Sequence, residues 1–312
     1  MSTRLKDTSG EPAFYDYVLI RRIDVCWSEV EMLKAILKNY INYILSFCLT
    51  LSIILMSNQL VNAVNPISIP IFSLHEVVEL NKLPQSSLYT NTKQDLEKFL
   101  DYLVRNKYWF LSTQELSEYF IEKSKPIPSQ HLSQKPIMLT FDDGYKGVHT
   151  HLFPVLESLK KKYGMTAKLV LFVNPSSINS AAHLTCDDLR KGLSQGFYDI
   201  QSHSFHHYNL TKLSDNQLTF ELTEAKQFLR QCTQGLDSNQ TVALHLAYPY
   251  GSSDALVQML ASKYYLSGYS YENLAMQPEQ LKNKYQLPRL NITKNTSLTK
   301  MIQLAESSSR LK

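Results

Sequence analysis

Two adjacent carboxylates, Asp142 and Asp143, directly follow the apolar run Pro136–Phe141. Neighbouring carboxylates repel each other unless a cation or a shared proton relieves the repulsion. Hydrolytic metal sites use such a pair, with one carboxylate on the ion and the other handling protons. The pair therefore favours a metal-assisted hydrolytic site, although a solvated Asp-Asp-Gly turn would have the same sequence.

A histidine cluster, His203-Ser204-Phe205-His206-His207, follows a short predicted strand, 198–202. His203 and His207 are four residues apart, so one helical turn would put both on one face. Imidazoles combined with a carboxylate suit Zn²⁺ or a similar ion and leave positions open for water. His206 would then point elsewhere, unless the loop takes a wider turn and makes it the ligand. A polar surface loop is the alternative interpretation.

A third stretch, Ala247-Tyr248-Pro249-Tyr250-Gly251, ends another predicted strand. Pro249 fixes its own φ and Gly251 permits a tight turn, so backbone N–H groups could be aimed at one point. Such a group of donors can hold an oxyanion. An ordinary turn at the end of a strand explains the same residues, so this motif is weak by itself.

The elements that would carry these stretches alternate between strand-like and helix-like patterns from Asn65 onward. The predicted strands are 67–74, 136–141, 167–173, 198–202, 242–248 and 266–270, and the predicted helices are 92–107, 112–120, 149–163, 185–195, 213–232 and 254–264. This repeat predicts an α/β fold, a distorted and incomplete TIM-like (β/α) barrel with a parallel sheet, whose strand carboxyl ends face the active site. An open doubly wound sheet is the alternative, but no GxGxxG follows the first strand.

The composition restricts the class of protein. The chain has 312 residues, with 44% hydrophobic and 19% charged, which excludes a wholly disordered protein. The net charge is only +4 and no compact basic stripe occurs, so we expect no nucleic-acid partner. The 19 tyrosines suit sugar-stacking surfaces as well as ordinary packing.

The N-terminal segment resembles an export signal. The uncharged run Tyr43–Met56 follows Lys34 and Lys38 and is shorter than the about 20 residues of a membrane span. Cleavage near Ala63 or an uncleaved anchor would both put 64–312 outside the cytoplasm, and a buried core helix is a third option. We therefore divide the chain into a leader, 1–63, and a catalytic domain, 64–312. The start codon, at Met1 or at Met32 just before the run, stays open.

Four cysteines are present, and neither the early nor the late pair has CxxC spacing. A zinc site built from cysteines is therefore not expected. Cys186 and Cys232 could form a disulfide if the protein is exported, but the sequence does not give the distance between them.

Together, TFDDG, HSFHH and AYPYG resemble the polysaccharide deacetylases of carbohydrate esterase family 4, which have the NodB-homology fold. The resemblance covers roughly residues 67–292. The segment SLHEV, which contains His75, is similar to the subgroup that includes the poly-β-1,6-N-acetylglucosamine deacetylases of biofilm systems. This resemblance implies a metal-dependent hydrolase that removes acetyl groups from a polysaccharide.

The resemblance also implies roles for single residues. Asp143, His203 and His207 would be metal ligands, and Asp142 would be the general base. His75 would be the general acid, since no histidine follows His245 in the chain. The backbone N–H of Tyr250 would help to hold the oxyanion. Arg289 would pair with Asp142 and tune it, because Ala247 stands where most of the family has an arginine.

This chemistry suits an N-acetyl amide, which is a poor electrophile with a poor leaving group. We expect a secreted or membrane-anchored monomer that binds a divalent metal, Zn²⁺ before Co²⁺ or Ni²⁺, and deacetylates an extracellular or cell-wall N-acetylglucosamine polymer. Two alternatives stay open: a hydrolase of the same fold acting on another bond, such as a xylan acetyl ester or a small cyclic amide, and a non-catalytic carbohydrate-binding protein. The polymer and the metal are not fixed by the sequence.

Overall fold

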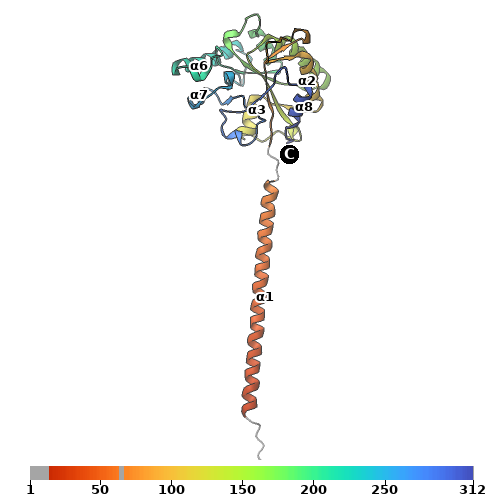
Figure 1. Cartoon of the computed structure of the whole chain (residues 1–312), viewed down its shortest axis with the longest axis vertical. Helices are drawn as coiled ribbons and strands as arrows, with labels where there is room; N and C mark the ends of the chain where they lie inside the picture. The colour runs from red at the N-terminus through yellow and green to blue at the C-terminus, as the bar shows by residue number, and fades with distance from the viewer. Residues whose placement is uncertain (1–13, 63–66, 312) are drawn as a thin grey trace, which may run out of the picture. The chain divides into compact units, whose positions relative to one another are not determined.

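The computed structural model describes residues 14–62 and 67–311 and divides into two units, Met1–Asn65 and Pro66–Lys312. In the first unit, helix α1 spans Phe14–Asn62 (Figure 1). Within α1, Glu29–Ile53 is long and apolar enough to cross a membrane, and the side chains of these residues are all exposed. The apolar run seen in the sequence is thus part of a longer helix, and 29–53 does not pack as a core helix.

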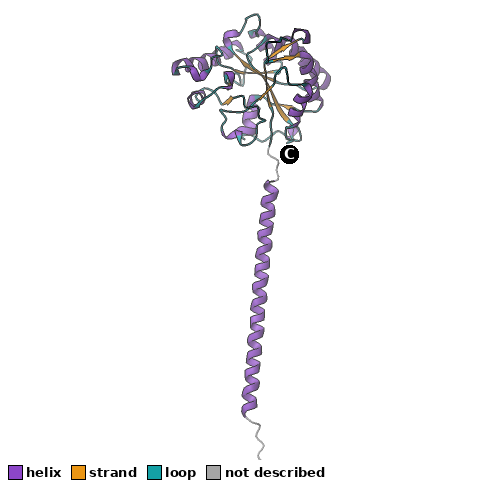
Figure 2. Cartoon of the chain, in the orientation of Figure 1, coloured by secondary structure: helices purple, strands orange, loops and turns teal. Residues whose placement is uncertain are grey.

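A parallel sheet forms the centre of the second unit (Figure 2). Its strands run in the order β10-β1-β5-β6-β7-β8-β9, and β4 also pairs with β5. The strands are β1 (Ile71–Leu74), β4 (Trp109–Phe110), β5 (Pro136–Phe141), β6 (Leu169–Val173), β7 (Tyr198–Ser202), β8 (His245–Ala247), β9 (Ser267–Tyr269) and β10 (Leu290–Asn291). A small parallel pair, β2 (Glu76–Val78) and β3 (Thr90–Thr92), follows β1.

The segment around β10 joins the two edges of the sheet. At one end, the Leu287 N–H donates to the carbonyl of Gly268 in β9 at 2.8 Å. At the other end, the Ile292 N–H donates to the carbonyl of Ser73 in β1 at 2.9 Å. The curled sheet therefore approaches closure, as a distorted and incomplete (β/α) barrel does, and Arg289 lies in the joining segment. The predicted fold class is confirmed.

Seven α-helices pack around this sheet in the described residues of the second unit, most of them on its outside. They are α2 (Lys93–Arg105), α3 (Thr113–Leu116), α4 (Phe153–Tyr163), α5 (Cys186–Ser194), α6 (Asp215–Cys232), α7 (Ala255–Ala261) and α8 (Leu298–Glu306). Figure 1 shows α2 beside α8 on one flank and α6 near α7 on the opposite flank. Polar caps set where several helices begin: Thr92, Ser112 and Thr185 each accept a hydrogen bond from the third residue of the helix that follows.

Alternating side chains of the strands separate two apolar layers. Along β5, Ile137 and Leu139 pack against the covering helices, whereas Met138 packs inside the barrel with Val170 and Phe172 of β6. Because side chains of a strand alternate between its faces, Thr140 and Asp142 continue the inner row that begins at Met138. The period of β5 therefore directs Asp142 towards the barrel interior.

Several predicted elements are longer than those observed. The structure has β8 only at His245–Ala247, within predicted strand 242–248, and the predicted helix 112–120 is α3 followed by a π-helical turn, Ser117–Ile121. The helix predicted at 149–163 is likewise α4 preceded by a π-helical turn, Val148–Leu152. Cys186 and Cys232 form a disulfide with their Cα atoms 5.4 Å apart, which links α5 to α6.

Candidate active site

The end of β5 turns two neighbouring carboxylates in different directions. Asp142 is fully buried, and its N–H donates to the Leu74 carbonyl of β1 at 2.9 Å. Asp143 has a left-handed backbone, with φ 69°, which is uncommon for a residue other than glycine. This turn carries the Asp143 side chain to the cavity at the carboxyl end of the sheet, where it is only partly covered.

Three side chains, those of Asp143, His203 and His207, converge at the carboxyl end of the sheet. One candidate ligand atom each from Asp143, His203 and His207 lies within 4.8 Å of the other two. Asp143 Oδ1 is 3.5 Å from His203 Nε2 and 3.2 Å from His207 Nε2. One carboxylate and two imidazoles at such spacing form a donor set that suits a divalent ion such as Zn²⁺.

The hydrogen bonds of His203 leave one ring nitrogen available to an ion. Its Nδ1 donates to the Ala247 carbonyl at the end of β8, at 2.8 Å, which assigns the lone pair to Nε2. His203 Nε2 and Asp143 Oδ1 are buried, and within 67–311 neither has a hydrogen-bond partner. Buried polar atoms are normally satisfied, so two converging orphan atoms fit a bound cation.

The histidine loop is not helical, which corrects the sequence interpretation. Ser204 and His207 both have left-handed backbones, with φ of 62° and 63°, and the loop reverses between them. The His207 N–H donates to Ser204 Oγ at 3.2 Å, and the Glu221 carboxylate of α6 accepts from the N–H groups of Phe205 and His206. His203 and His207 therefore meet through a tight loop that α6 holds in place.

His206 lies outside the cluster. Its Nδ1 donates to Glu221 Oε1 at 2.6 Å, and its ring stacks between Tyr208 and Phe220. The second ring of the cluster belongs to His207, as the four-residue spacing predicts, although the backbone reaches that position by another route.

A buried ion pair fixes Asp142. Arg289 is fully buried and donates two parallel hydrogen bonds to Asp142, at 2.7 and 2.9 Å. Arg289 also donates to Thr140 Oγ1 at 3.0 Å, and its guanidinium packs on the Tyr271 ring. Burial alone would raise the pKa of Asp142, but the charge of Arg289 and the neighbouring histidines hold it below its ordinary value. Asp142 is therefore a carboxylate with a fixed orientation.

Burial also shifts the pKa values of the three clustered residues. It raises the pKa of Asp143 to about 6 and lowers that of His203 to about 3. Burial lowers the pKa of His207 as well. The two imidazoles are therefore neutral, which is the form that binds metals, and a nearby cation would favour the ionised form of Asp143.

His75 occupies the bend between β1 and β2 and faces the same cavity. Burial lowers its pKa, against the opposing effect of Asp142 and Asp143. Its Nε2 lies 3.3 Å from the Tyr271 hydroxyl, and its ring packs beside Tyr89. The bend thus brings a histidine from the beginning of the second unit close to Asp142 and Asp143.

Tyr271 is a site residue that the sequence analysis missed. Its hydroxyl makes a short hydrogen bond to Asp142 Oδ2 and is also the neighbour of His75 Nε2. Tyr271 therefore connects the carboxylate and the histidine. Its position, two residues beyond the end of β9, was an available signal, because His75, Asp142 and His203 also follow the carboxyl ends of parallel strands.

Tyr250 forms the remaining side of the cavity. Its backbone is left-handed, with φ 59°, inside the short turn Pro249–Gly251. Its side chain is exposed, and its ring lies 4.7 Å from that of His207. A Cβ at Gly251 would come within 2.7 Å of the Tyr271 ring, so this turn requires glycine.

The cavity itself has a volume of about 300 Å³, at the lower end of ligand sites. It is lined by His75, Glu76, Ser87, Tyr89, Asp143, Tyr145, His207, Tyr250 and Tyr271. Its walls combine tyrosines with a few polar groups.

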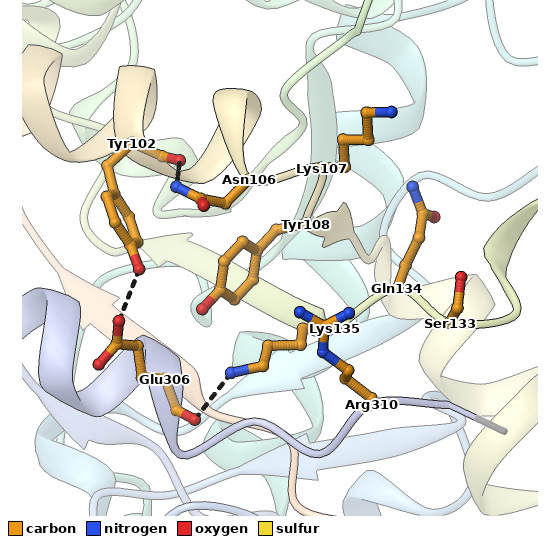
Figure 3. Close-up of a pocket in the computed structure, with 9 residues that line it drawn as sticks. All are labelled: Tyr102, Asn106, Lys107, Tyr108, Ser133, Gln134, Lys135, Glu306 and Arg310. Carbon is orange, nitrogen blue, oxygen red and sulfur yellow. Dashed lines mark hydrogen bonds between the residues drawn. The ribbon is translucent and has the colours of Figure 1, made fainter.

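A second cavity, of about 320 Å³, lies near the amino end of β5 (Figure 3). Lys107, Lys135 and Arg310 line it together with Tyr102, Tyr108 and Glu306. Tyr102 donates to the Glu306 carboxylate at 2.8 Å, and Lys135 donates to the Glu306 carbonyl at 3.1 Å. The lining residues include no histidine and no pair of carboxylates, so this cavity lacks the groups for metal-assisted hydrolysis.

The fold resembles several solved deacetylase structures. The deacetylase PplD of Streptococcus pyogenes, in complex with acetate, superposes with a TM-score of 0.64 at 22% identity, covering 77% of this chain and 99% of that one. IcaB of Ammonifex degensii gives a TM-score of 0.59 at 18% identity, covering 77% and 98%. A de-N-acetylase of Aggregatibacter actinomycetemcomitans gives 0.58 at 16% identity, covering 76% and 99%. At these identities the likeness concerns the fold.

Two comparisons show that the likeness extends to the amino-acid sequence. The family model described as polysaccharide deacetylase matches residues 129–269, which contain both the Asp pair and the histidine loop. The Bacillus subtilis (strain 168) protein YxkH, named as a polysaccharide deacetylase, is 28% identical over 233 residues, which are 74% of each chain. In sequence, the part of the chain that carries the candidate site is therefore similar to the polysaccharide deacetylases.

Proposed function

We propose that this protein is a metal-dependent N-deacetylase that acts on N-acetylglucosamine units of an extracellular polysaccharide. The observation that carries the proposal is the convergence of Asp143, His203 and His207 beside the Asp142–Arg289 pair. A protein that only binds carbohydrate has no use for orphaned metal-ligand atoms next to a buried ionised carboxylate.

Asp143, His203 and His207 would hold the divalent ion, with Zn²⁺ as the first candidate. When bound, such an ion polarises a carbonyl and makes water more acidic. The Ala247 carbonyl orients His203 for this task through its Nδ1, and Glu221 of α6 holds the loop that carries His207.

Asp142 would act as the general base. Its pair with Arg289 keeps it ionised and fixes both oxygens, so it can accept the proton of the water that attacks the acetamide carbon. Its Oδ2 lies 3.8 Å from His203 Nε2, which puts the base at the edge of the metal cluster.

His75 would act as the general acid. Expulsion of the amine requires a proton on nitrogen as the C–N bond breaks, and a protonated imidazole with a lowered pKa is a better donor for it. The Tyr271 hydroxyl contacts both His75 and Asp142, so it would hold the acid and the base at a fixed separation. The Tyr250 N–H would donate to the oxyanion from the other side of the cavity.

The substrate class rests on the chemistry of the cavity and on the family. Tyrosines 89, 145, 250 and 271 line the cavity, and such rings suit the apolar faces of sugars. The His75 segment resembles the subgroup of poly-β-1,6-N-acetylglucosamine deacetylases, which favours an N-acetylated glucosamine chain as the substrate. We propose the same chemical class here, without fixing the linkage.

We further propose that 1–63 is a leader that exports the domain and anchors or releases it outside the cytoplasm. The membrane-length helix Glu29–Ile53 and the Cys186–Cys232 disulfide support this, since structural disulfides persist in oxidising compartments. In intact cells, a membrane-impermeant protease should cut the domain only if it faces outward. Protection of the domain until the cells are lysed would contradict export.

The test of the activity uses the full chain in detergent, loaded with Zn²⁺, Co²⁺ or Ni²⁺. N-acetylglucosamine oligomers of β-1,4 and β-1,6 linkage are offered beside acetylated xylan, and free amine and acetate are both counted. We expect amine release from at least one glucosamine series. Acetate release from xylan alone would mean an esterase, and a folded protein without any release would remove the proposal.

A further inference from the structure

The active-site cavity contains one carboxylate for which the reaction has no task. Glu76 begins β2, directly after His75, and lines the cavity with Asp143. Side chains alternate along β2: Val77 is buried in the core, whereas Glu76 is half-buried at the cavity wall. The strand thus directs Glu76 towards the space that the substrate occupies.

This carboxylate has no partner of its own. Within 67–311, Glu76 makes no side-chain hydrogen bond and no ion pair. The other two acids near it are engaged, because Arg289 holds Asp142 and the two histidines surround Asp143. Burial raises the pKa of Glu76, and no cationic side chain offsets that effect. A ligand with a positive charge would stabilise the ionised form of a carboxylate in this position.

The surroundings of Glu76 favour a sugar-sized cation. Ser87 and Tyr89, from the segment that leads into β3, and Tyr145, which follows the Asp pair, line the same cavity. Burial raises the pKa of Tyr145, and the negative charges of Asp143 and Glu76 raise it further. Lysine and arginine are missing from the residues that line the cavity.

The proposed reaction produces a matching cation. Hydrolysis of an N-acetyl group leaves a primary amine, which is largely protonated in neutral water. A polymer that has already been processed therefore carries ammonium groups on units next to those that still carry acetyl groups. We infer that Glu76 forms a subsite for the ammonium group of a glucosamine unit that flanks the reacting unit, so that the enzyme favours chains that are already partly deacetylated.

This inference rests on the proposed function and deepens it. The size of the effect follows from the position of Glu76 at an open cavity wall. An ion pair that is partly exposed contributes less than a buried one, so a preference of about three- to tenfold is expected.

The experiment compares two defined oligomers of equal length and linkage, measured with the full chain in detergent. One is fully N-acetylated, and the other has a single free amine on the unit beside its N-acetyl target. The readout is the ratio of kcat/KM for the amine-containing oligomer to that for the fully acetylated one. We expect this ratio to fall about three- to tenfold in Glu76→Gln, and to stay at the wild-type value in Glu97→Gln, which removes an exposed carboxylate on α2.

A second readout does not depend on turnover. A fully deacetylated glucosamine oligomer should bind the wild-type protein more tightly than Glu76→Gln, and rising salt should weaken only the wild-type binding. The salt dependence of wild-type binding tests the subsite even if the variant folds poorly.

The outcomes are distinguishable. An unchanged ratio in Glu76→Gln overturns the ammonium subsite, whether kcat/KM is kept on both oligomers or falls equally on both. An equal fall would mean that Glu76 binds sugar hydroxyls. Wild-type protein that hydrolyses neither oligomer overturns the proposed function instead. Wild-type hydrolysis together with the expected fall in the ratio supports both.

Discussion

The cavity at the carboxyl end of the sheet and the cavity near the amino end of β5 are nearly equal in volume, about 300 and 320 Å³, but differ in their chemistry. At the carboxyl end of the sheet, buried ionisable side chains come from the end of β5, from the His203–His207 loop and from the segment before β10. Two ligand atoms without hydrogen-bond partners, His203 Nε2 and Asp143 Oδ1, converge there. At the amino end, Lys107 and Arg310 are exposed to solvent, and the Glu306 carboxylate accepts a hydrogen bond from Tyr102 (Figure 3).

Cavity volume alone therefore does not distinguish a catalytic site from an ordinary surface cavity. Buried charges and unpaired donor atoms are costly, and a fold retains them where a ligand or a reaction uses them. The amino-end cavity carries no such cost, because its charged groups are solvated or paired. The comparison can be tested by changing one cavity at a time.

The largest effect should come from the metal cluster. His203→Ala removes a proposed ligand whose position the Ala247 carbonyl fixes, and the loss of the ion would take away several kcal/mol of transition-state stabilisation. Activity should fall by at least about 10³-fold. The measurement is amine release after metal loading, with circular dichroism to show that the variant is folded. Activity within tenfold of wild type would contradict the site.

The next effect should come from the base. Asp142→Asn keeps the size of the side chain but cannot accept the proton, so kcat should fall by on the order of 10²–10⁴. The change also leaves Arg289 buried without its counter-charge, which should lower the free energy of unfolding by about 3–5 kcal/mol. Metal content should stay at the wild-type level, since Asp142 is not one of the three proposed ligands. Unchanged kcat would assign the base elsewhere.

A smaller effect is expected at the residue that joins acid and base. Tyr271→Phe removes the hydroxyl that contacts Asp142 and His75, and should lower kcat about tenfold with little change in KM, since a positioning bond contributes about 1–2 kcal/mol. Tyr265→Phe is the matched control, because it removes a buried hydroxyl bonded to Ser202 and to the Leu222 carbonyl. Equal losses of kcat in both variants would reduce the role of Tyr271 to stability.

The smallest effect should come from the amino-end cavity. Lys107→Gln and Lys135→Gln change its charge, and we expect kcat/KM on the glucosamine oligomers within about twofold of wild type, since neither residue lines the catalytic cavity. A loss above tenfold in either folded variant would mean that this second cavity takes part in the reaction.

Much of the scaffold could be predicted from the sequence because its signals are local. The strands predicted at 136–141 and 198–202 have the bounds of β5 and β7, and the caps at Thr92 and Thr185 mark where helices begin. The placement of three polar motifs after parallel strands follows from the rule that carboxyl ends share one edge of the sheet.

The remaining features depend on contacts between distant residues. No local pattern shows that Ser204 and His207 adopt left-handed backbones, because Glu221, in another helix, pins the loop between them. The short strands β2 and β10 have too few residues for a periodic signal, so the positions of Glu76 and Arg289 appear only in the folded chain. The Cys186–Cys232 disulfide likewise depends on how α5 packs beside α6.

The central claim is that Asp143, His203 and His207 bind one divalent ion. The most direct test is elemental analysis of the full chain after chelation, reloading with Zn²⁺ and removal of unbound metal. We predict one ion per chain for wild type and for His245→Asn, which changes a buried histidine outside the cluster, and none for His207→Ala. Equal metal content in wild type and His207→Ala would contradict the claim.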